Sequence, residues 1–285
     1  MIHEFIISDL TVISIYVIVV LSFNLTVGFT GLVNLGHMAF FGFGAYASAL
    51  LTLSGVPWYI ALPLAGILTG ILGAIIAAIT VRLKGDYFQI VTLGLVFIAI
   101  TISRNWISLT RGALGLPGVP EIIRNNFHYM LFVMAILTAC VIFFYWLTNS
   151  ETGKIFQAIR DDETATAILG KNTYLYKVLS ITISTFFAGI AGSLFVHYIQ
   201  FVDPTIFDLE FFVLILAMLI AGGLASIKGS IIGVFSLSIL LTSIRFIFAD
   251  ISPELIGAMR QMLFMLILIL ILIYRPRGMF GKVDV

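Results

Sequence analysis

Long apolar runs separated by short polar turns fill most of this chain. No Asp, Glu, Lys or Arg occurs between Leu10 and Val81, a stretch much longer than the roughly 20 residues that cross a bilayer core. The runs are continuous and do not alternate with polar positions, which favours helices over the strands of a membrane barrel. The pattern therefore predicts an all-α, polytopic transmembrane helical bundle.

The turns divide the chain into about nine predicted spans, within a range of 8–10. Gly28 to Gly31, the Ser54–Pro57 turn and the charged segment 82–86 mark the first divisions. The span count is open at residues 28–53, because the glycines there could break the second span into two half-helices. The predicted spans are residues 8–27, 32–53, 58–81, 87–104, 128–148, 177–199, 210–226, 229–249 and 257–274.

The positions of Lys and Arg predict the direction of the spans, because short cytoplasmic loops are rich in both. With nine spans, the N-terminus outside and the C-terminus inside, ten of these cations lie inside and three outside. The inside set is Arg82, Lys84, Lys154, Arg160, Lys171, Lys177, Lys228, Arg275, Arg277 and Lys282, and the outside set is Arg104, Arg111 and Arg124.

Composition agrees with lipid as the solvent of this chain. Hydrophobic residues make up 61% of it and charged residues 10%, whereas an average soluble domain is about a quarter charged. The net charge of +1 gives no reason to expect a nucleic-acid partner. The first segment lacks a short apolar region followed by a cleavage site, so we expect no cleaved signal peptide. Cys140, the one cysteine, is expected to pack as a small hydrophobic residue.

One long segment, 149–177, lies on the predicted cytoplasmic side and reads NSETGKIFQAIRDDETATAILGKNTYLYK. It is rich in helix formers, and its Gly170 followed by Asn172 is typical of a helix stop. Acidic residues 161–163 are flanked by basic ones. Two interpretations stay open at this point: a solvated surface helix, or a docking helix for a cytoplasmic partner.

The segment GKIFQAIRDDETATAILGKN resembles the cytoplasmic loop of branched-chain amino-acid ABC-importer permeases. Further segments are similar to landmarks of that family in the same order: residues 31–51 (GLVNLGHMAFFGFGAYASALL), 82–94 (RLKGDYFQIVTLG), 109–120 (LTRGALGLPGVP), 201–207 (FVDPTIF), 221–233 (AGGLASIKGSIIG) and 274–281 (YRPRGMFG). The GDYF and RDDE segments indicate the LivM type. The resemblance assigns to an ATPase-coupling loop Gly153, Lys154, Ala158, Arg160, Asp161, Asp162, Glu163 and Gly170.

The resemblance implies a single transmembrane permease domain over residues 1–285, with 149–177 as its coupling loop, in a prokaryotic cell membrane. Expected partners are a LivH-type permease subunit, two cytoplasmic ATPase subunits and an extracytoplasmic solute-binding protein. The expected solute is a branched-chain or related small amino acid. Neither Gly153–Lys154 nor Gly170–Lys171 has the glycine spacing or the Ser or Thr of a phosphate-binding loop. We therefore expect no cofactor in this chain and no enzyme activity, with ATP and Mg used by the partner subunits.

Glycine-rich segments are the candidate translocation path, because glycine permits close helix approach and local breaks whose backbone groups can line a polar route. The candidates are Gly31, Asn34, Gly36, His37, Gly222 and Gly223. Tight packing inside the subunit is an alternative explanation for the same residues. Asp203–Pro204, on the predicted outer face, is either a turn or a contact for the binding protein.

Three other functions remain as alternatives. The first is a permease of the same family for urea or short amides. The second is a self-contained secondary transporter or channel, although no span carries a central acid for a proton relay. The third is an intramembrane enzyme, although no catalytic cluster, HExxH motif or metal-ligand set is present in the sequence.

Overall fold

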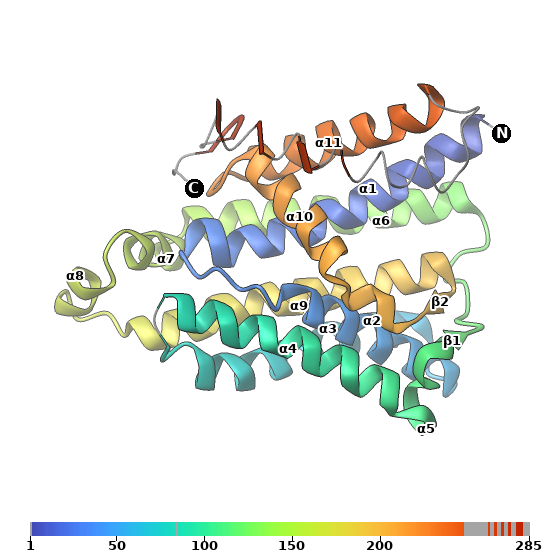
Figure 1. The fold of residues 1–285 in the computed structure, drawn as a ribbon, viewed down its shortest axis with the longest axis horizontal. Coiled ribbons are helices and arrows are strands. Elements are labelled where there is room, and N and C mark those ends of the chain that lie inside the picture. Colours follow the sequence, from blue (N-terminus) through green and yellow to red (C-terminus); the bar gives the residue numbers. More distant parts are fainter. Residues whose placement is uncertain are drawn as a thin grey trace.

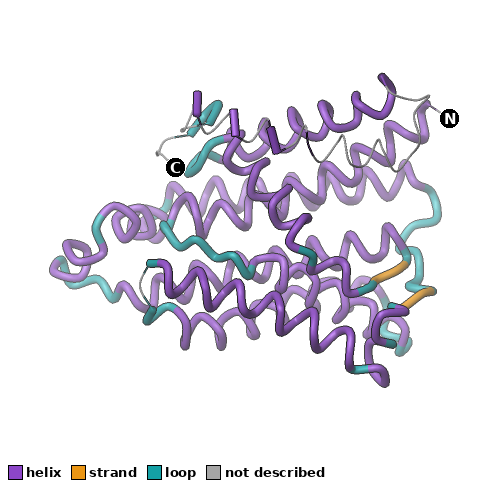
Figure 2. Tube along the Cα trace, in the orientation of Figure 1, coloured by secondary structure: helices purple, strands orange, loops and turns teal. Residues whose placement is uncertain are grey.

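The structure, a computed structural model, describes residues 2–83 and 85–247, together with residues 262, 265–266, 269–270, 273–274 and 278–281. In these residues the chain is helical apart from turns and one pair of two-residue strands (Figures 1 and 2). The main helices are α1 (Ile2–Asn24), α2 (His37–Leu53), α3 (Trp58–Thr80), α4 (Asp86–Asn105), α6 (Asn126–Asn149), α9 (Thr173–Ile199), α10 (Leu209–Gly222) and α11 (Ile227–Ile247). The short helices are α5 (Ile107–Thr110), α7 (Glu151–Asp161) and α8 (Glu163–Ile168), with a π-helix η1 (Leu25–Phe29) and 3-10 helices η2 (Gly112–Leu114) and η3 (Pro204–Phe207).

In the described part of the chain, five helices are long and apolar enough to cross a membrane: α1 continued by η1, α3, α4, α6 and α9. The helices α2, α10 and α11 are apolar as well. These eight helices coincide with the first eight predicted spans, which confirms the prediction of an all-α membrane protein. The ninth predicted span, 257–274, lies almost entirely outside the described residues, as do Lys84, Arg275, Arg277 and Lys282.

The difference from the predicted bounds that bears on the candidate site is at the second span. Helix α2 begins at His37 and not at residue 32, because Gly31 has a φ of 75° and residues 31–36 form no helix. The glycines inside the span do not divide it, since Gly42 and Gly44 lie within an unbroken α2. The break therefore lies between α1 and α2.

Helix α9 lies at the centre of the bundle, where it packs against α1, α2 and α3. Small residues allow this packing. A Cβ atom on Gly44 of α2 would overlap the backbone of Gly189 in α9, so the two helices meet backbone to backbone at this point. Such contacts between small residues hold membrane helices together where lipid removes the hydrophobic driving force.

The two ends of the bundle differ in what they carry (Figure 1). Helices α7 and α8 project from one end, whereas the start of α1 lies at the other end together with β1 and β2. Strand β1 (Leu116–Pro117) pairs antiparallel with β2 (Phe201–Val202), with Leu116 opposite Val202. This pairing fixes the long connection between α4 and α6 against the end of α9.

Candidate functional site

The projecting segment is built from three capped helices. Ser150 caps α7, since its Oγ accepts a hydrogen bond from the Gly153 N–H, 3.3 Å away. Asp162 caps α8, because its Oδ1 accepts from the N–H groups two and three residues later, at 2.8 and 2.9 Å. Asn172 caps α9 in the same way, and Gly170, with a φ of 80°, ends the preceding turn. The helix stop predicted from Gly170 and Asn172 is confirmed, and the caps fix the path of residues 149–177.

Helix α7 turns its apolar face toward the bundle. Phe156 and Ile159 are buried, whereas Lys154, Ala158 and Asp161 are exposed. The ring of Phe156 lies 6.3 Å from that of Tyr176 in α9. The burial of this face holds the segment at a fixed position against the bundle.

Arg160 joins α7 to the end of α1. Its Nη1 donates a hydrogen bond to the carbonyl of Gly28 in η1, at 2.9 Å, and its Nε and Nη2 donate to Oδ1 of Asp161 at 2.9 and 2.8 Å. The side chain is only 16% exposed. A Cβ atom on Gly31 would lie 2.8 Å from Cγ of Arg160. Glycine at 31 therefore provides both the positive φ and the space that this contact requires.

The polar backbone groups at the break between α1 and α2 form hydrogen bonds with both local and distant partners. The Leu32 N–H donates to the Thr26 carbonyl at 2.8 Å, and the Leu35 N–H donates to Oγ1 of Thr92 in α4 at 3.2 Å. The hydroxyl of Thr30 donates to the Leu25 carbonyl at 2.8 Å and lies near the hydroxyl of a serine in α9. Non-helical backbone inside a membrane protein is stable only where other protein groups replace the lost helical bonds, as they do here.

An ion pair fastens α8 to α9. Nζ of Lys177 lies 2.5 Å from Oε2 of Glu163, and Oγ1 of Thr173 donates to the other carboxylate oxygen at 3.3 Å. The Lys177 side chain is 9% exposed and that of Glu163 is 40% exposed. Burying an ammonium group requires such a partner.

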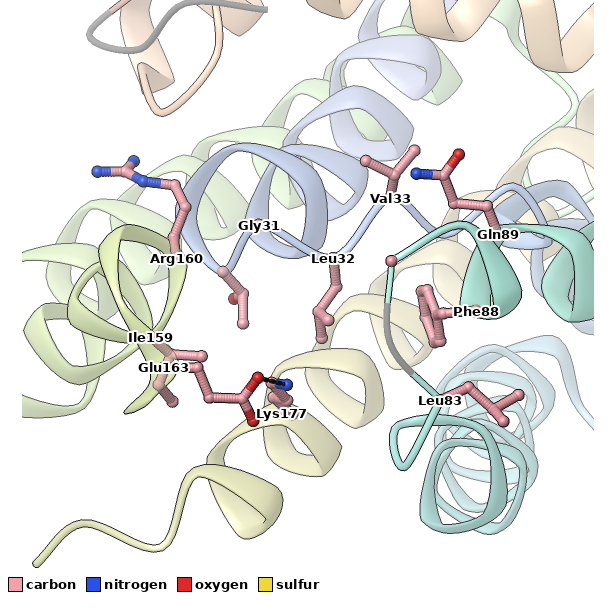
Figure 3. Close-up of a pocket in the computed structure, with 12 residues that line it drawn as sticks. Gly31, Leu32, Val33, Leu83, Phe88, Gln89, Ile159, Arg160, Glu163 and Lys177 are labelled. Carbon is pink, nitrogen blue, oxygen red and sulfur yellow. Dashed lines mark ion pairs between the residues drawn. The ribbon is translucent and has the colours of Figure 1, made fainter. Parts of the chain in front are cut away.

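A cavity of 230 Å³ lies between the break, α4, α7 and α9 (Figure 3). The Lys177–Glu163 pair lies on one wall, and Leu32 projects beside it (Figure 3). Phe88 and Gln89 of α4 form the opposite wall. Of the residues predicted from the sequence, Arg160 and Glu163 of the coupling loop and Gly31 of the path line this cavity, and the others do not.

The other candidate path residues are enclosed within the subunit. His37 is fully buried, stacks on Phe23 at 4.9 Å and has its Nε2 3.0 Å from Oγ of Ser22. Asn34 is also buried, and its Oδ1 accepts from the Gly36 N–H at 3.0 Å. Their role in the path stays a prediction.

Gly222 and Gly223 lie at the turn between α10 and α11, where Gly222 packs against the backbone of Gly229. Asn24 joins this turn to α1. Its Oδ1 accepts from the Ala225 N–H at 3.0 Å, and its Nδ2 donates to Oγ of Ser230 at 2.7 Å. Asn24 thus connects the end of α1 to the second glycine-rich segment.

Three further points concern residues elsewhere in the chain. Asp203–Pro204 forms the turn that was one of its two predicted roles, since η3 begins at Pro204 and Asp203 precedes it as the cap residue. Among the described residues, no group of three or more His, Cys, Asp or Glu side chains is arranged to hold a metal ion. Cys140 is buried, as expected of a packing residue.

Comparison with known proteins gives consistent matches along the chain. The profile of a family described as branched-chain amino acid transport system / permease component matches residues 5–272. The High-affinity branched-chain amino acid transport system permease proteins LivM of Escherichia coli (strain K12) and Salmonella typhimurium are each 30% identical over 302 residues, covering 94% of this chain and 68% of theirs. A probable branched-chain amino acid transport permease protein LivM of Methanocaldococcus jannaschii is 25% identical, covering 93% of this chain and 90% of its own.

A solved structure, PsaBC from Streptococcus pneumoniae in complex with Fab, has a similar fold. Its TM-score is 0.51 at 16% sequence identity, and the match covers 93% of this chain and 91% of that chain. At this identity the similarity concerns the arrangement of the helices alone.

Proposed function

Because this chain belongs to the family of branched-chain amino acid transport system permease components, we propose that it is the LivM-type membrane subunit of an ABC importer. It forms part of the path for a branched-chain or related small amino acid through a prokaryotic cell membrane. The LivM names of its relatives support this solute class.

The subunit spans the membrane about nine times, with its N-terminus outside and α7 and α8 in the cytoplasm. The distribution of described cations supports this orientation, because cytoplasmic ends are enriched in Lys and Arg. The end that carries α7 and α8 also has the turn between α3 and α4 and the starts of α9 and α11, and the described cations of these segments are Arg82, Lys154, Arg160, Lys171, Lys177 and Lys228. The end that carries β1 and β2 has the connection from the end of α4 to the start of α6, whose cations are Arg104, Arg111 and Arg124.

Residues 149–177 form the coupling loop, which fits a groove on one of the two cytoplasmic ATPase subunits. One observation carries this assignment: Ile168 and Leu169, at the tip of the projection, are 82% and 80% exposed. Adjacent apolar side chains exposed at a projecting tip are typical of a protein contact. Arg160 and Glu163, by contrast, have partners within the chain, so they position the loop and transmit its movement.

The remaining partners complete the importer. A second permease subunit of the LivH type shares the path, and an extracytoplasmic binding protein delivers the solute to the end that carries β1 and β2. The partner ATPase subunits use ATP and Mg, and this chain contributes no cofactor. Gly31, Asn34, Gly36, His37, Gly222 and Gly223 belong to the broken segments that change conformation during transport.

Co-purification tests the docking assignment. We expect Leu169→Asp to release the ATPase subunits from the detergent-solubilised complex, because an aspartate would have to lose its hydration in an apolar contact. Leu114→Asp is the matched control, since Leu114 is also exposed but lies near β1 at the opposite end. Full retention of the ATPase subunits by Leu169→Asp would contradict the assignment.

Reconstitution tests the transport function. The complete complex in proteoliposomes should take up leucine only with ATP and the binding protein. Uptake by this chain alone would instead indicate a self-contained transporter. Uptake of urea or acetamide in preference to leucine would indicate the alternative solute class.

A further inference from the structure

A second cavity, of 360 Å³, lies at the end of the bundle that carries β1 and β2. Residues of α1, α9, β2, η3 and α10 line it. This volume is at the lower end of the range for small-molecule sites. The cavity is thus large enough for a small solute and lies on the side from which the solute arrives.

One wall of this outer cavity is aromatic. The rings of Tyr16 and Phe211 are 5.3 Å apart, and those of Phe195 and Phe211 are 6.3 Å apart. Phe41 lies behind them, with its ring 5.6 Å from both Phe195 and Phe211. Because four helices contribute these rings, the wall is formed before any ligand binds.

The rim of the outer cavity carries an acid. Asp203 is the only charged residue among the described residues that line the cavity. Oγ1 of Thr205 donates a hydrogen bond to its Oδ1 at 2.6 Å. A carboxylate has about four lone-pair positions on its two oxygens, so it can accept further hydrogen bonds from a cation.

We infer that the outer cavity is a binding subsite for the transported amino acid, an inference that rests on the proposed function. Asp203 accepts hydrogen bonds from the α-ammonium group, and the aromatic wall of Tyr16, Phe195 and Phe211 holds the apolar side chain. The subsite selects apolar amino acids, because an acidic side chain would have to lose its hydration against the aromatic wall. Removing a methylene from the side chain weakens binding by roughly tenfold or more.

A cysteine-protection experiment tests this subsite in the complete complex. Cys140, the one native cysteine, is buried, so Ile199→Cys places a single reactive thiol on the exposed rim. Labelling by a membrane-impermeant maleimide, added on the binding-protein side of proteoliposomes, reports access to the cavity. Leucine at tenfold above its dissociation constant should slow labelling about tenfold.

Leucine analogues separate the two interactions. Isoamylamine, which keeps the ammonium and the side chain, should also slow labelling. The carboxylate 4-methylpentanoate, which lacks the ammonium, should leave the rate unchanged. Asp203→Asn should abolish protection by leucine without altering the unprotected labelling rate. Leu114→Cys is the control thiol, exposed at the same end but outside the cavity, and leucine should not protect it.

Three results would overturn the inference: an unreactive Ile199→Cys thiol, no protection by leucine, or equal protection by 4-methylpentanoate. Equal protection by 4-methylpentanoate would indicate a site for apolar chains, such as the acyl chains of lipid. Leucine uptake measured in the same proteoliposomes separates this inference from the proposed function. Uptake without protection overturns the subsite alone, whereas absence of leucine uptake in a complex with active ATPase subunits overturns the proposed function.

Discussion

Arg160 and Gly28 lie 132 residues apart in the sequence, yet Nη1 of Arg160 donates a 2.9 Å hydrogen bond to the Gly28 carbonyl. Gly28 belongs to the last turn before the break, where helix carbonyls lack partners within the helix. A side chain of α7 therefore caps the end of α1. A displacement of α7 would act directly on the segment that connects α1 to α2.

Arg160→Lys should weaken the coupling between ATP hydrolysis and transport. The planar guanidinium of Arg160 donates to the Gly28 carbonyl and to the Asp161 carboxylate at once, and a lysine ammonium group cannot reproduce this geometry. The loss of a charged hydrogen bond costs about 1.5–3 kcal/mol. We expect the amount of solute moved per ATP to fall by roughly tenfold or more, with the ATPase subunits still bound through Ile168 and Leu169. The measurement is the ratio of uptake to hydrolysis in proteoliposomes. Asp161→Asn, which keeps the Gly28 bond, is the control, and an unchanged ratio in Arg160→Lys would refute the prediction.

The ion pair between Lys177 and Glu163 should respond unequally to its two single substitutions. Glu163→Gln leaves an almost fully buried ammonium group unpaired, which costs about 3 kcal/mol. Lys177→Met leaves a carboxylate that water still reaches and should cost about 1 kcal/mol. Thermal unfolding in detergent should rank Glu163→Gln as the less stable variant. The double variant should be more stable than Glu163→Gln alone, and the opposite ranking would show that Lys177 is hydrated.

Gly44→Ala should separate α2 from α9. The new side chain would overlap the backbone at Gly189, and overpacking of this kind costs about 1–3 kcal/mol. Gly94→Ala in α4 is the matched control, because a Cβ atom there meets nothing within 4 Å. The control should be neutral or slightly stabilising. Equal folded yields of the two variants after detergent extraction would contradict the packing argument.

Asn24→Leu should loosen the turn between α10 and α11. It removes the acceptor of the buried Ala225 N–H and the donor to Ser230, and an unsatisfied buried group costs about 1–3 kcal/mol. Hydrogen exchange at residues 222–230 should accelerate by about tenfold, while exchange in α9 stays unchanged. Equal acceleration in both regions would indicate general destabilisation.

The helical bundle could be predicted because its solvent is lipid. The charge-free stretch from Leu10 to Val81 requires helices, and turns such as Ser54–Pro57 give their divisions. The start of α2 could not be placed this way, since the break before it depends on Thr92 and Arg160, which are distant in sequence. An apolar run with glycines predicts that a break is possible, but tertiary partners decide where it lies.

The candidate site was predictable as a segment but not in its contacts. Asp162 and Asn172 cap α8 and α9 as their residue types favour. The contact of the Arg160 side chain with the end of α1 could not be inferred, because its partner there is a backbone carbonyl, which any residue type provides. The contacts of Asn24 could not be predicted either, because an asparagine in an apolar run gives the same sequence pattern whether it bonds within its own helix or to a distant segment.

The contact of Arg160 with Gly28 and Gly31 has a consequence for chimeric proteins. Arg160 belongs to residues 149–177, the proposed coupling loop, whereas Gly28 and Gly31, which it contacts, lie outside that segment. A chimera in which residues 149–177 alone are exchanged should therefore lose the fit between this segment and the residues around Gly28 and Gly31. Exchange of residues 149–177 together with residues 24–36 would transfer both sides of the contact. These two segments should therefore be exchanged together when a chimera is designed to bind the ATPase subunits of another importer.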